Sequence, residues 1–238
     1  MFLTKRDENK IKDCTFVWMR TFEKHNRLKD HPPEAVVLAA GFSERMGQPK
    51  ALLTTATGQT FTEHCSQVLL EAGCSSVIVV IQPEHKEQIL NGRFTDAVKI
   101  VVNPRPERGR FSSVLCGMAH VSGQSAVFVH NVDNPMITDS IIRFIHENFM
   151  PHYTVPFFQS KGGHPVLLGA EVVRALQHEK NDQQSLKTFL SSWKRHSLQV
   201  PFDEVLCNLN TADDVRAYLS NAQKKGLPFQ ATPTHNQP

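Results

Sequence analysis

From residue 34 onward, short apolar runs rich in β-branched residues alternate with longer amphipathic stretches. The first run covers residues 35–39, an amphipathic stretch follows at 60–72, and a second apolar run lies at 77–81. A chain that alternates between strands and helices in this way forms parallel strands, because each helix carries the chain back across a face of the sheet. The pattern therefore predicts an α/β fold with a mostly parallel central sheet and helices on both faces.

The same alternation continues toward the C-terminus, with shorter pieces after Pro151. Thr138 is expected to cap the helix that starts beside it. We expect further strands at residues 98–102, 126–129, 153–156, 166–168 and 197–200, and further helices at 83–90, 112–120, 138–147, 171–178, 184–191 and 211–220.

This pattern divides the chain into three parts. Residues 35–222 form one predicted folded domain, and the polar, proline-containing stretch over 223–238 is predicted to be disordered. Residues 1–34 form an N-terminal extension in which Phe16, Trp18 and Phe22 can share one face of an amphipathic helix. Three interpretations of the extension stay open: a helix that packs on the domain, a segment that binds a partner, or a stretch upstream of the functional start codon.

The charge balance and the cysteines exclude several classes of protein. The 26 basic and 23 acidic residues leave a net charge of +3 over 238 residues, whereas nucleic-acid binding needs a dense stripe of Lys and Arg. The apolar runs fall well short of the roughly 20 residues that cross a bilayer, and charges occupy the start, where a secretory signal is apolar. The five cysteines include no Cys-x-x-Cys pair. We therefore predict a cytoplasmic protein with reduced thiols and with neither a nucleic-acid nor a membrane partner.

The segment after the first strand, residues 40–50, combines glycines with two cations. Small residues such as Gly41 let a backbone approach a ligand closely, and amide groups at such a turn point toward anionic oxygens. Arg45 and Lys50 add two positive charges that suit a triphosphate. The spacing matches neither the Walker loop nor the dinucleotide fingerprint Gly-x-Gly-x-x-Gly. The segment therefore predicts a phosphate-binding loop of another kind, with an ordinary strand-to-helix turn as the alternative.

Residues 37–53 resemble a known signature, Leu-Ala-Ala/Gly-Gly-x-Ser-x-Arg-Met-Gly-x-x-Lys-x-Leu. This signature is typical of nucleotidyltransferases, and especially of the molybdenum cofactor cytidylyl- and guanylyltransferases. The resemblance implies a single Rossmann-like nucleotidyltransferase domain whose loop wraps the phosphates of a nucleoside triphosphate. It also implies that Arg45 and Lys50 act in catalysis by holding the leaving pyrophosphate. The other nucleotide-binding candidates in this segment are Leu38, Ala39, Ala40, Gly41, Ser43 and Gly47.

Later segments match the same family in the same order, so that the resemblance covers about residues 35–220. Residues 103–118 look like the family's Asn-Pro…Gly-x-x-x-Ser…Gly stretch, which meets the nucleotide near its base and ribose. The resemblance therefore makes Ser112, Ser113 and Gly117 nucleotide-binding candidates.

Two further matches concern the metal and the acceptor. Residues 127–137 are similar to the strand end whose aspartate binds Mg²⁺, which implies that Asp133 is a catalytic residue and a metal ligand. Residues 161–168 look like the Gly-His-Pro-Val-Leu segment beside the acceptor, so Gly163 and His164 are acceptor-binding candidates. His164 lies among small residues with little bulk to bury it, and it either orients the acceptor or only hydrogen-bonds the backbone.

One segment departs from the cytidylyltransferase pattern. Many of those relatives carry Asp-x-Asp-Thr near the C-terminus, whereas residues 208–211 read Asn-Leu-Asn-Thr, which resembles the guanylyltransferase form. An amide oxygen can ligate a metal but contributes no charge, so Asn210 is a second and weaker candidate metal ligand beside Asp133. Residues 39–41 and 163–165 favour the cytidylyl type, and CTP is therefore preferred over GTP.

The resemblance predicts a Mg²⁺-dependent enzyme that transfers a nucleoside monophosphate from CTP or GTP to a phosphorylated acceptor, preferably molybdopterin, and releases pyrophosphate. Such a transfer needs positioning and charge stabilisation more than a covalent group on the protein. Two alternatives stay open: transfer to a sugar phosphate or another phosphorylated alcohol on the same scaffold, and a catalytically weak chaperone that binds nucleotide or cofactor. A molybdoenzyme or another protein of the cofactor pathway is the expected macromolecular partner.

Overall fold

The computed structural model describes residues 31–43 and 46–224. The amphipathic helix predicted in the N-terminal extension lies outside these residues, as does nearly all of the predicted disordered tail. Arg45 also lies outside them, so its role in phosphate binding stays a prediction.

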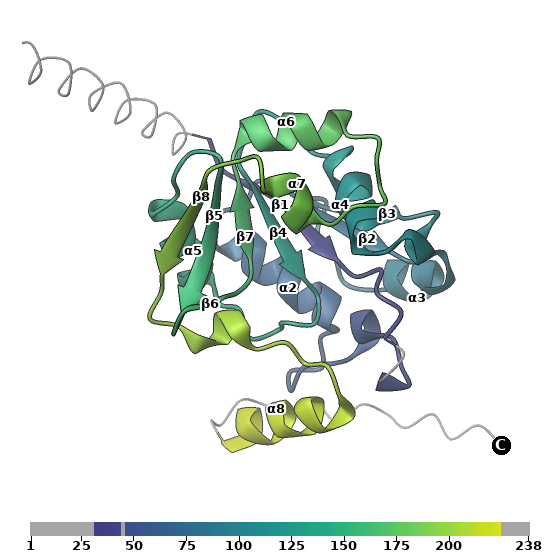
Figure 1. The fold of residues 1–238 in the computed structure, drawn as a ribbon. Coiled ribbons are helices and arrows are strands. Elements are labelled where there is room, and N and C mark those ends of the chain that lie inside the picture. The colour runs from purple at the N-terminus through teal and green to yellow at the C-terminus, as the bar shows by residue number, and fades with distance from the viewer. Residues whose placement is uncertain (1–30, 44–45, 225–238) are drawn as a thin grey trace, which may run out of the picture.

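The described residues form one sheet in the order β3-β2-β1-β4-β7-β5-β6, with β8 paired to β5 (Figure 1). The strands are β1 (Glu34–Leu38), β2 (Val77–Ile81), β3 (Val98–Val102), β4 (Val127–Asn131), β5 (Tyr153–Phe158), β6 (Lys161–Gly162), β7 (Val166–Leu168) and β8 (Arg195–Gln199). Strands β1 to β4 run parallel to one another, whereas β7 is antiparallel to both β4 and β5. The predicted α/β fold is confirmed, and its sheet has a parallel half and a mixed half that meet at β4.

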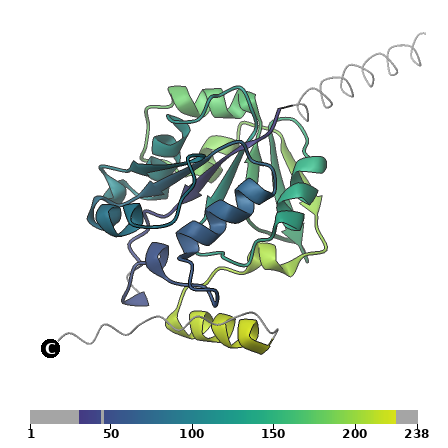
Figure 2. The same ribbon diagram turned by 180° about the vertical axis from the view of Figure 1, so that it is seen from behind.

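Helices cover both faces of this sheet, as predicted (Figures 1 and 2). One face packs against α2 (Phe61–Glu71) and α5 (Asp139–Glu147) through apolar side chains such as Leu69 and Ile141. The other face packs against α4 (Arg110–Met118), α6 (Ala170–His178) and α7 (Leu186–Leu190) through Val114, Val172 and Leu190. The remaining helices are α3 (Lys86–Leu90) and α8 (Ala212–Lys224), with 3-10 turns at η2 (Lys50–Leu52), η3 (Pro83–His85), η4 (Pro106–Arg108) and η5 (Asp203–Leu206).

Local hydrogen bonds explain where several helices begin. Thr60 caps α2, because its hydroxyl accepts from the Glu63 amide while the Glu63 carboxylate accepts from the Thr60 amide. Thr138 caps α5 by accepting from the Ile141 amide, which confirms the predicted cap. Helix α4 begins at Arg110, two residues before the predicted start, because Gly109 turns the chain at a φ of 91°.

Other expectations about the elements need small corrections. The predicted helix at residues 83–90 is divided into η3 and α3, and α7 is shorter than the predicted 184–191 because Ser185 caps it. Strand β6 and the turn η5 were not predicted, since two paired residues and a single turn are too short to produce a periodic pattern.

The carboxyl ends of β1 and β4 lie next to each other at one edge of the sheet. Leu38 and Asn131, the last residues of these two strands, are paired in the register. The chain therefore brings residues 39–43 and residues 132–134 to the same edge. Ligands of open α/β sheets bind at this edge, where the direction of the strand order changes.

Candidate functional site

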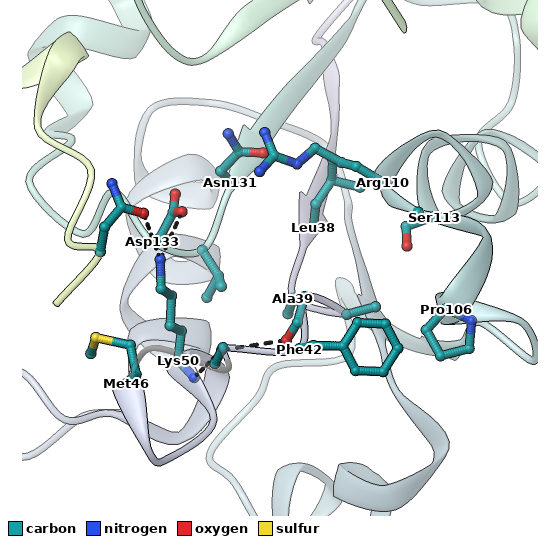
Figure 3. Close-up of a pocket in the computed structure, with 16 residues that line it drawn as sticks. Leu38, Ala39, Phe42, Met46, Lys50, Pro106, Arg110, Ser113, Asn131 and Asp133 are labelled. Carbon is teal, nitrogen blue, oxygen red and sulfur yellow. Dashed lines mark hydrogen bonds and ion pairs between the residues drawn. The ribbon is translucent and has the colours of Figure 1, made fainter. Parts of the chain in front are cut away.

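A cavity of about 400 Å³ opens at this edge (Figure 3). Nine of the residues predicted to form a site line it: Leu38, Ala39, Ala40, Gly41, Ser43, Lys50, Ser113, Asp133 and Asn210. The remaining lining residues are Phe42, Met46, Pro106, Gly109, Arg110, Asn131 and Val132. The strand-end segments that are far apart in the sequence thus surround one space, which we call the first cavity.

Three predicted polar residues meet at one side of the first cavity. The Lys50 ammonium donates to Asp133 Oδ2 at 3.2 Å and to Asn210 Oδ1 at 2.9 Å (Figure 3). Lys50 and Asp133 each keep 14% of their side-chain surface exposed. Oδ1 of Asp133 is buried and has no hydrogen-bond partner within the described residues. One carboxylate oxygen is therefore free to accept a further interaction, and an unsatisfied buried carboxylate oxygen is costly.

The loop before Lys50 is held by Ser43. The Ser43 hydroxyl accepts from the Lys50 amide at 3.1 Å and donates to the Gly41 carbonyl at 3.3 Å. Ser43 itself adopts a φ of 52°, a conformation that non-glycine residues rarely adopt. No atom lies within 4 Å of the position that a Gly41 Cβ would occupy, so the Gly41 backbone faces open space in the cavity. This loop can present main-chain groups directly to a ligand.

Asp133 and Asn210 are positioned by the C-terminal segment. The Leu209 amide donates to the Asp133 carbonyl at 2.7 Å, and the Asn134 side chain donates to the Glu204 carbonyl at 2.9 Å. The Asp214 carboxylate accepts from the amide of Asn210 at 2.8 Å. This bond, with a second from the next amide, lowers the pKa of Asp214. The carboxylate therefore stays ionised and fixes the backbone of Asn210.

Some predicted nucleotide-binding residues lie outside the first cavity. Ser112 is buried, where it accepts from the Asn103 side chain and donates to the Gly109 carbonyl, so it holds the loop beside Ser113. Gly117 belongs to α4 and faces the sheet, where a Cβ would lie 2.5 Å from Val36 Cγ1 in β1. Gly47 occupies a turn with a φ of 68°. These residues support the loops around the cavity, and the structure places none of the three on its wall.

A second cavity of about 590 Å³ adjoins the first. The two cavities share Leu38, Arg110 and Asn131. Most of the other lining residues are apolar or aromatic, and two cations, Lys187 and Arg195, also belong to the wall. Its remaining lining residues are Phe111, Val114, Val129, Tyr153, Val155, His164, Val166, Ser185, Leu186 and Leu190. Apolar walls with a few polar groups are typical of a site that binds an organic molecule.

The predicted acceptor residue His164 belongs to this second cavity. The Asn131 side-chain amide donates to its Nε2 at 3.0 Å, and its own amide donates to the Val205 carbonyl at 2.9 Å. Burial lowers the pKa of His164; the Asp133 carboxylate opposes this shift and the Arg110 cation adds to it. His164 is half-buried, so it is more enclosed than the small residues beside it in the sequence led us to expect. The other predicted acceptor residue, Gly163, lines neither cavity. A Cβ there would lie 2.3 Å from the Val205 carbonyl oxygen, so glycine lets the chain pass η5.

Several lining residues were missed by the sequence reasoning. Phe42 stands in the first cavity with 54% of its surface exposed, although it lies inside the recognised signature. Asn131 is the last residue of β4, and its position two residues before Asp133 was a usable signal. Arg110 follows Gly109 inside the matched stretch over residues 103–118, which was also a usable signal. Tyr153 had none, because only the fold brings it to the second cavity.

Other expectations concern the rest of the described chain. Cys65, Cys74, Cys116 and Cys207 are free thiols, as predicted. Between residues 31 and 224, with residues 44 and 45 left aside, no group of three His, Cys, Asp or Glu side chains could hold a metal by itself. None of the described helices is long and apolar enough to span a bilayer. The cytoplasmic location stays a prediction.

Residues 35–202 match the model of the MobA-like NTP transferase domain. The chain belongs to this family. The predicted resemblance to the molybdenum cofactor nucleotidyltransferases is thereby confirmed. As a MobA-like NTP transferase, the protein is an enzyme of the nucleotidyltransferase class.

Individual relatives of this MobA-like transferase agree with the family. It is 25% identical over 184 residues to the molybdenum cofactor cytidylyltransferase of Escherichia coli K12, covering 76% of this chain and 92% of that protein. It is 27% identical over 218 residues to a probable molybdenum cofactor guanylyltransferase of Rhodopirellula baltica, covering 84% and 93%. A nucleotidyl transferase structure from Methanothermobacter thermautotroptrophicus has the same fold, with a TM-score of 0.67, 22% identity, and coverage of 82% and 99%.

Proposed function

We propose that this nucleotidyltransferase transfers a nucleoside monophosphate from CTP or GTP to a phosphorylated acceptor, with CTP and molybdopterin as the preferred pair. The observation that carries the proposal is the meeting of Lys50, Asp133 and Asn210 in a cavity that is also lined by the loop over residues 39–43. In the reaction, an oxygen of the acceptor phosphate forms a bond to the α-phosphorus. The bond from that phosphorus to the bridging oxygen breaks, and pyrophosphate leaves with the electron pair.

The proposed transfer needs no general base on the protein. A phosphate monoester has a second pKa near 6, so at neutral pH most of the acceptor is already the dianion. The protein must therefore align two charged groups and stabilise the charge that moves to the leaving pyrophosphate. Lys50 is the described residue that we assign to the phosphates, with Arg45 as its predicted companion, and the backbone of residues 39–41 approaches the nucleotide.

The residues at this site fit a divalent cation of the Mg²⁺ type. Mg²⁺ prefers oxygen ligands and is commonly held by one or two protein groups together with substrate phosphates. Asp133 offers a charged oxygen without a partner, and Asn210 offers a neutral one. We infer that these two side chains would hold Mg²⁺, which would supply positive charge at the phosphates.

The second cavity is where we place the acceptor. It contains His164, one of the two predicted acceptor residues, and it meets the first cavity at Leu38, Arg110 and Asn131. The apolar and aromatic wall suits a ring system, and the adjoining cations suit a phosphate. Molybdopterin, the acceptor implied by the relatives' names, combines these two features.

A pyrophosphate-release assay tests the proposal directly. The full chain is incubated with Mg²⁺ and each of CTP, GTP, ATP and UTP, first with molybdopterin and then with a sugar phosphate. Release with CTP or GTP that depends on molybdopterin supports the proposal. Turnover only with a sugar phosphate would identify the alternative acceptor class.

The neutral Asn210 favours one second candidate, a nucleotide-binding chaperone with weak catalysis. Calorimetry on the same protein distinguishes it from the enzyme. Tight binding of CTP or GTP without turnover for any acceptor would support the chaperone and contradict the transferase.

A further inference from the structure

Arg110 is the charged residue that the two cavities have in common. They share Leu38, Arg110 and Asn131, and of these only Arg110 carries a charge. Its side chain extends from the start of α4 toward Asn131, above Leu38 (Figure 3). Burial is the main cause of the lowered pKa of His164 in the second cavity, and the Arg110 cation makes a smaller contribution. Arg110 therefore stands at the junction of the two proposed substrate sites.

The charge of Arg110 is not neutralised by the protein around it. The neighbouring cations Arg105 and Arg108 both interact with Asp182, and Lys50 interacts with Asp133. Within the described residues, no carboxylate forms an ion pair with Arg110. Its side chain is exposed rather than packed in the core. The guanidinium and its hydrogen-bond donors are thus available to a ligand.

The position of Arg110 on α4 is also unfavourable for a cation. It is the first residue of a nine-residue helix whose first turn contains no acidic residue. The positive end of the helix dipole lies there and disfavours a second positive charge. An anion bound at this place would be stabilised by both the helix terminus and the guanidinium.

We propose that Arg110 binds the phosphate of the acceptor and holds it against the α-phosphate of the nucleotide. This inference rests on the proposed function, because that reaction brings two anions together at the junction of the cavities. Lys50 cannot serve the same purpose, since it lies on the side of the first cavity formed by Asp133 and Asn210. The planar guanidinium can donate to oxygens of both phosphates at once, which a single ammonium does less well.

The test uses the full chain loaded with CTP and Mg²⁺, with inorganic phosphate as the probe of the acceptor position. Phosphate binding is measured by calorimetry for wild type, Arg110→Gln and Arg110→Lys. Arg108→Gln is the matched control, because Arg108 pairs with Asp182 and lines neither cavity. We expect Arg110→Gln to weaken phosphate binding roughly 10- to 100-fold, the usual effect of losing a charge-assisted contact. Arg110→Lys should recover part of this loss, and Arg108→Gln should leave binding unchanged.

Steady-state kinetics with molybdopterin give the second measurement. Arg110→Gln should raise the KM for molybdopterin by a similar factor while the dissociation constant of CTP stays unchanged. Unchanged phosphate binding, or an equal loss of CTP affinity, would overturn the inference. If wild type shows Arg110-dependent phosphate binding but no turnover with any acceptor, the anion site stands and the proposed function fails.

Discussion

The two cavities of this protein are built in different ways. The first is formed by a loop of small residues at the end of β1 and by three polar side chains, Lys50, Asp133 and Asn210. The second is formed by apolar side chains from β4, β5, β7, α4 and α7. Phosphate binding needs main-chain groups at fixed spacing, whereas an organic ring can be surrounded by many combinations of side chains. The first cavity is therefore the part that the family signature specifies, and the second is the part that can vary.

The largest expected effect is a loss of turnover without a loss of folding, caused by a substitution in the first cavity. Asp133→Asn removes the carboxylate proposed to hold Mg²⁺, and we expect the rate of pyrophosphate release to fall roughly 10³-fold. The control is Asp139→Asn, an exposed carboxylate in the first turn of α5 that pairs with Arg143. It should retain full turnover. Thermal unfolding should show both variants folded, and wild-type turnover in Asp133→Asn would remove the metal assignment.

A substitution that fills the second cavity should weaken the binding of the acceptor and leave the binding of the nucleotide unchanged. Val155→Phe places a larger side chain in its wall, and we expect the KM for molybdopterin to rise roughly 10- to 200-fold, as for other misfits in apolar pockets. The affinity for CTP should not change, because Val155 does not line the first cavity. Val98→Phe is the control, a half-buried strand valine outside both cavities. Equal losses of affinity for molybdopterin and for CTP in Val155→Phe would show that the two cavities do not bind separate molecules.

Lowering the pH should reduce the stability of the sheet on which both cavities are built. His130 in β4 is buried, and burial lowers its pKa from 6.5 to about 3 in the folded protein, with a smaller contribution from His164. Below pH 6.5 the unfolded chain therefore binds more protons at His130 than the folded chain does. The contribution of neutral His130 to stability is present above that pH and is lost as the pH falls toward 3. From pH 7 to pH 5, His130 alone should lower the free energy of unfolding by about 2 kcal/mol.

Urea unfolding at several pH values measures this effect. His130→Gln should reduce the pH dependence, whereas His120→Gln, at an exposed position, should retain it. The same pH dependence in wild type and His130→Gln would contradict the assignment. CTP affinity measured at pH values where the protein is folded then shows whether the first cavity has any acid sensitivity of its own.

The smallest expected effect concerns the aromatic residue of the first cavity. Phe42→Ala removes a ring that can contact the nucleotide, and we expect the dissociation constant of CTP to rise about tenfold. Leu90→Ala is the matched control, since Leu90 is 53% exposed and Phe42 54%, but Leu90 lies outside both cavities. Binding of inorganic triphosphate should be unchanged in both variants. A loss of triphosphate affinity in Phe42→Ala would show instead that the loop itself has been disturbed.

The contrast between the cavities also explains what the sequence could predict. Strands β2, β3 and β7 match their predicted ranges residue for residue. β2 and β7 are buried, continuous apolar runs, and β3, at the edge of the sheet, is apolar except for Lys99. Lys50, Asp133 and Asn210 were predicted as site residues, and the structure brings them together. The position of Gly117 in the signature was recognised, yet its packing against Val36 depends on how closely α4 approaches β1. The second cavity has no local signal, since its lining residues extend from Leu38 to Arg195.

The C-terminal segment has a practical consequence for anyone who shortens this chain. The match to the family model ends at residue 202, and every strand of the sheet lies before that point. Yet the Leu209 amide bonds the Asp133 carbonyl, Asn210 accepts from Lys50, and the Tyr218 ring packs edge-on against Phe61 with the ring centroids 5.9 Å apart. A fragment trimmed to residues 35–202 would contain every strand of the sheet but would lack Asn210, which lines the first cavity. The boundary of the matched domain is thus not the boundary of the first cavity.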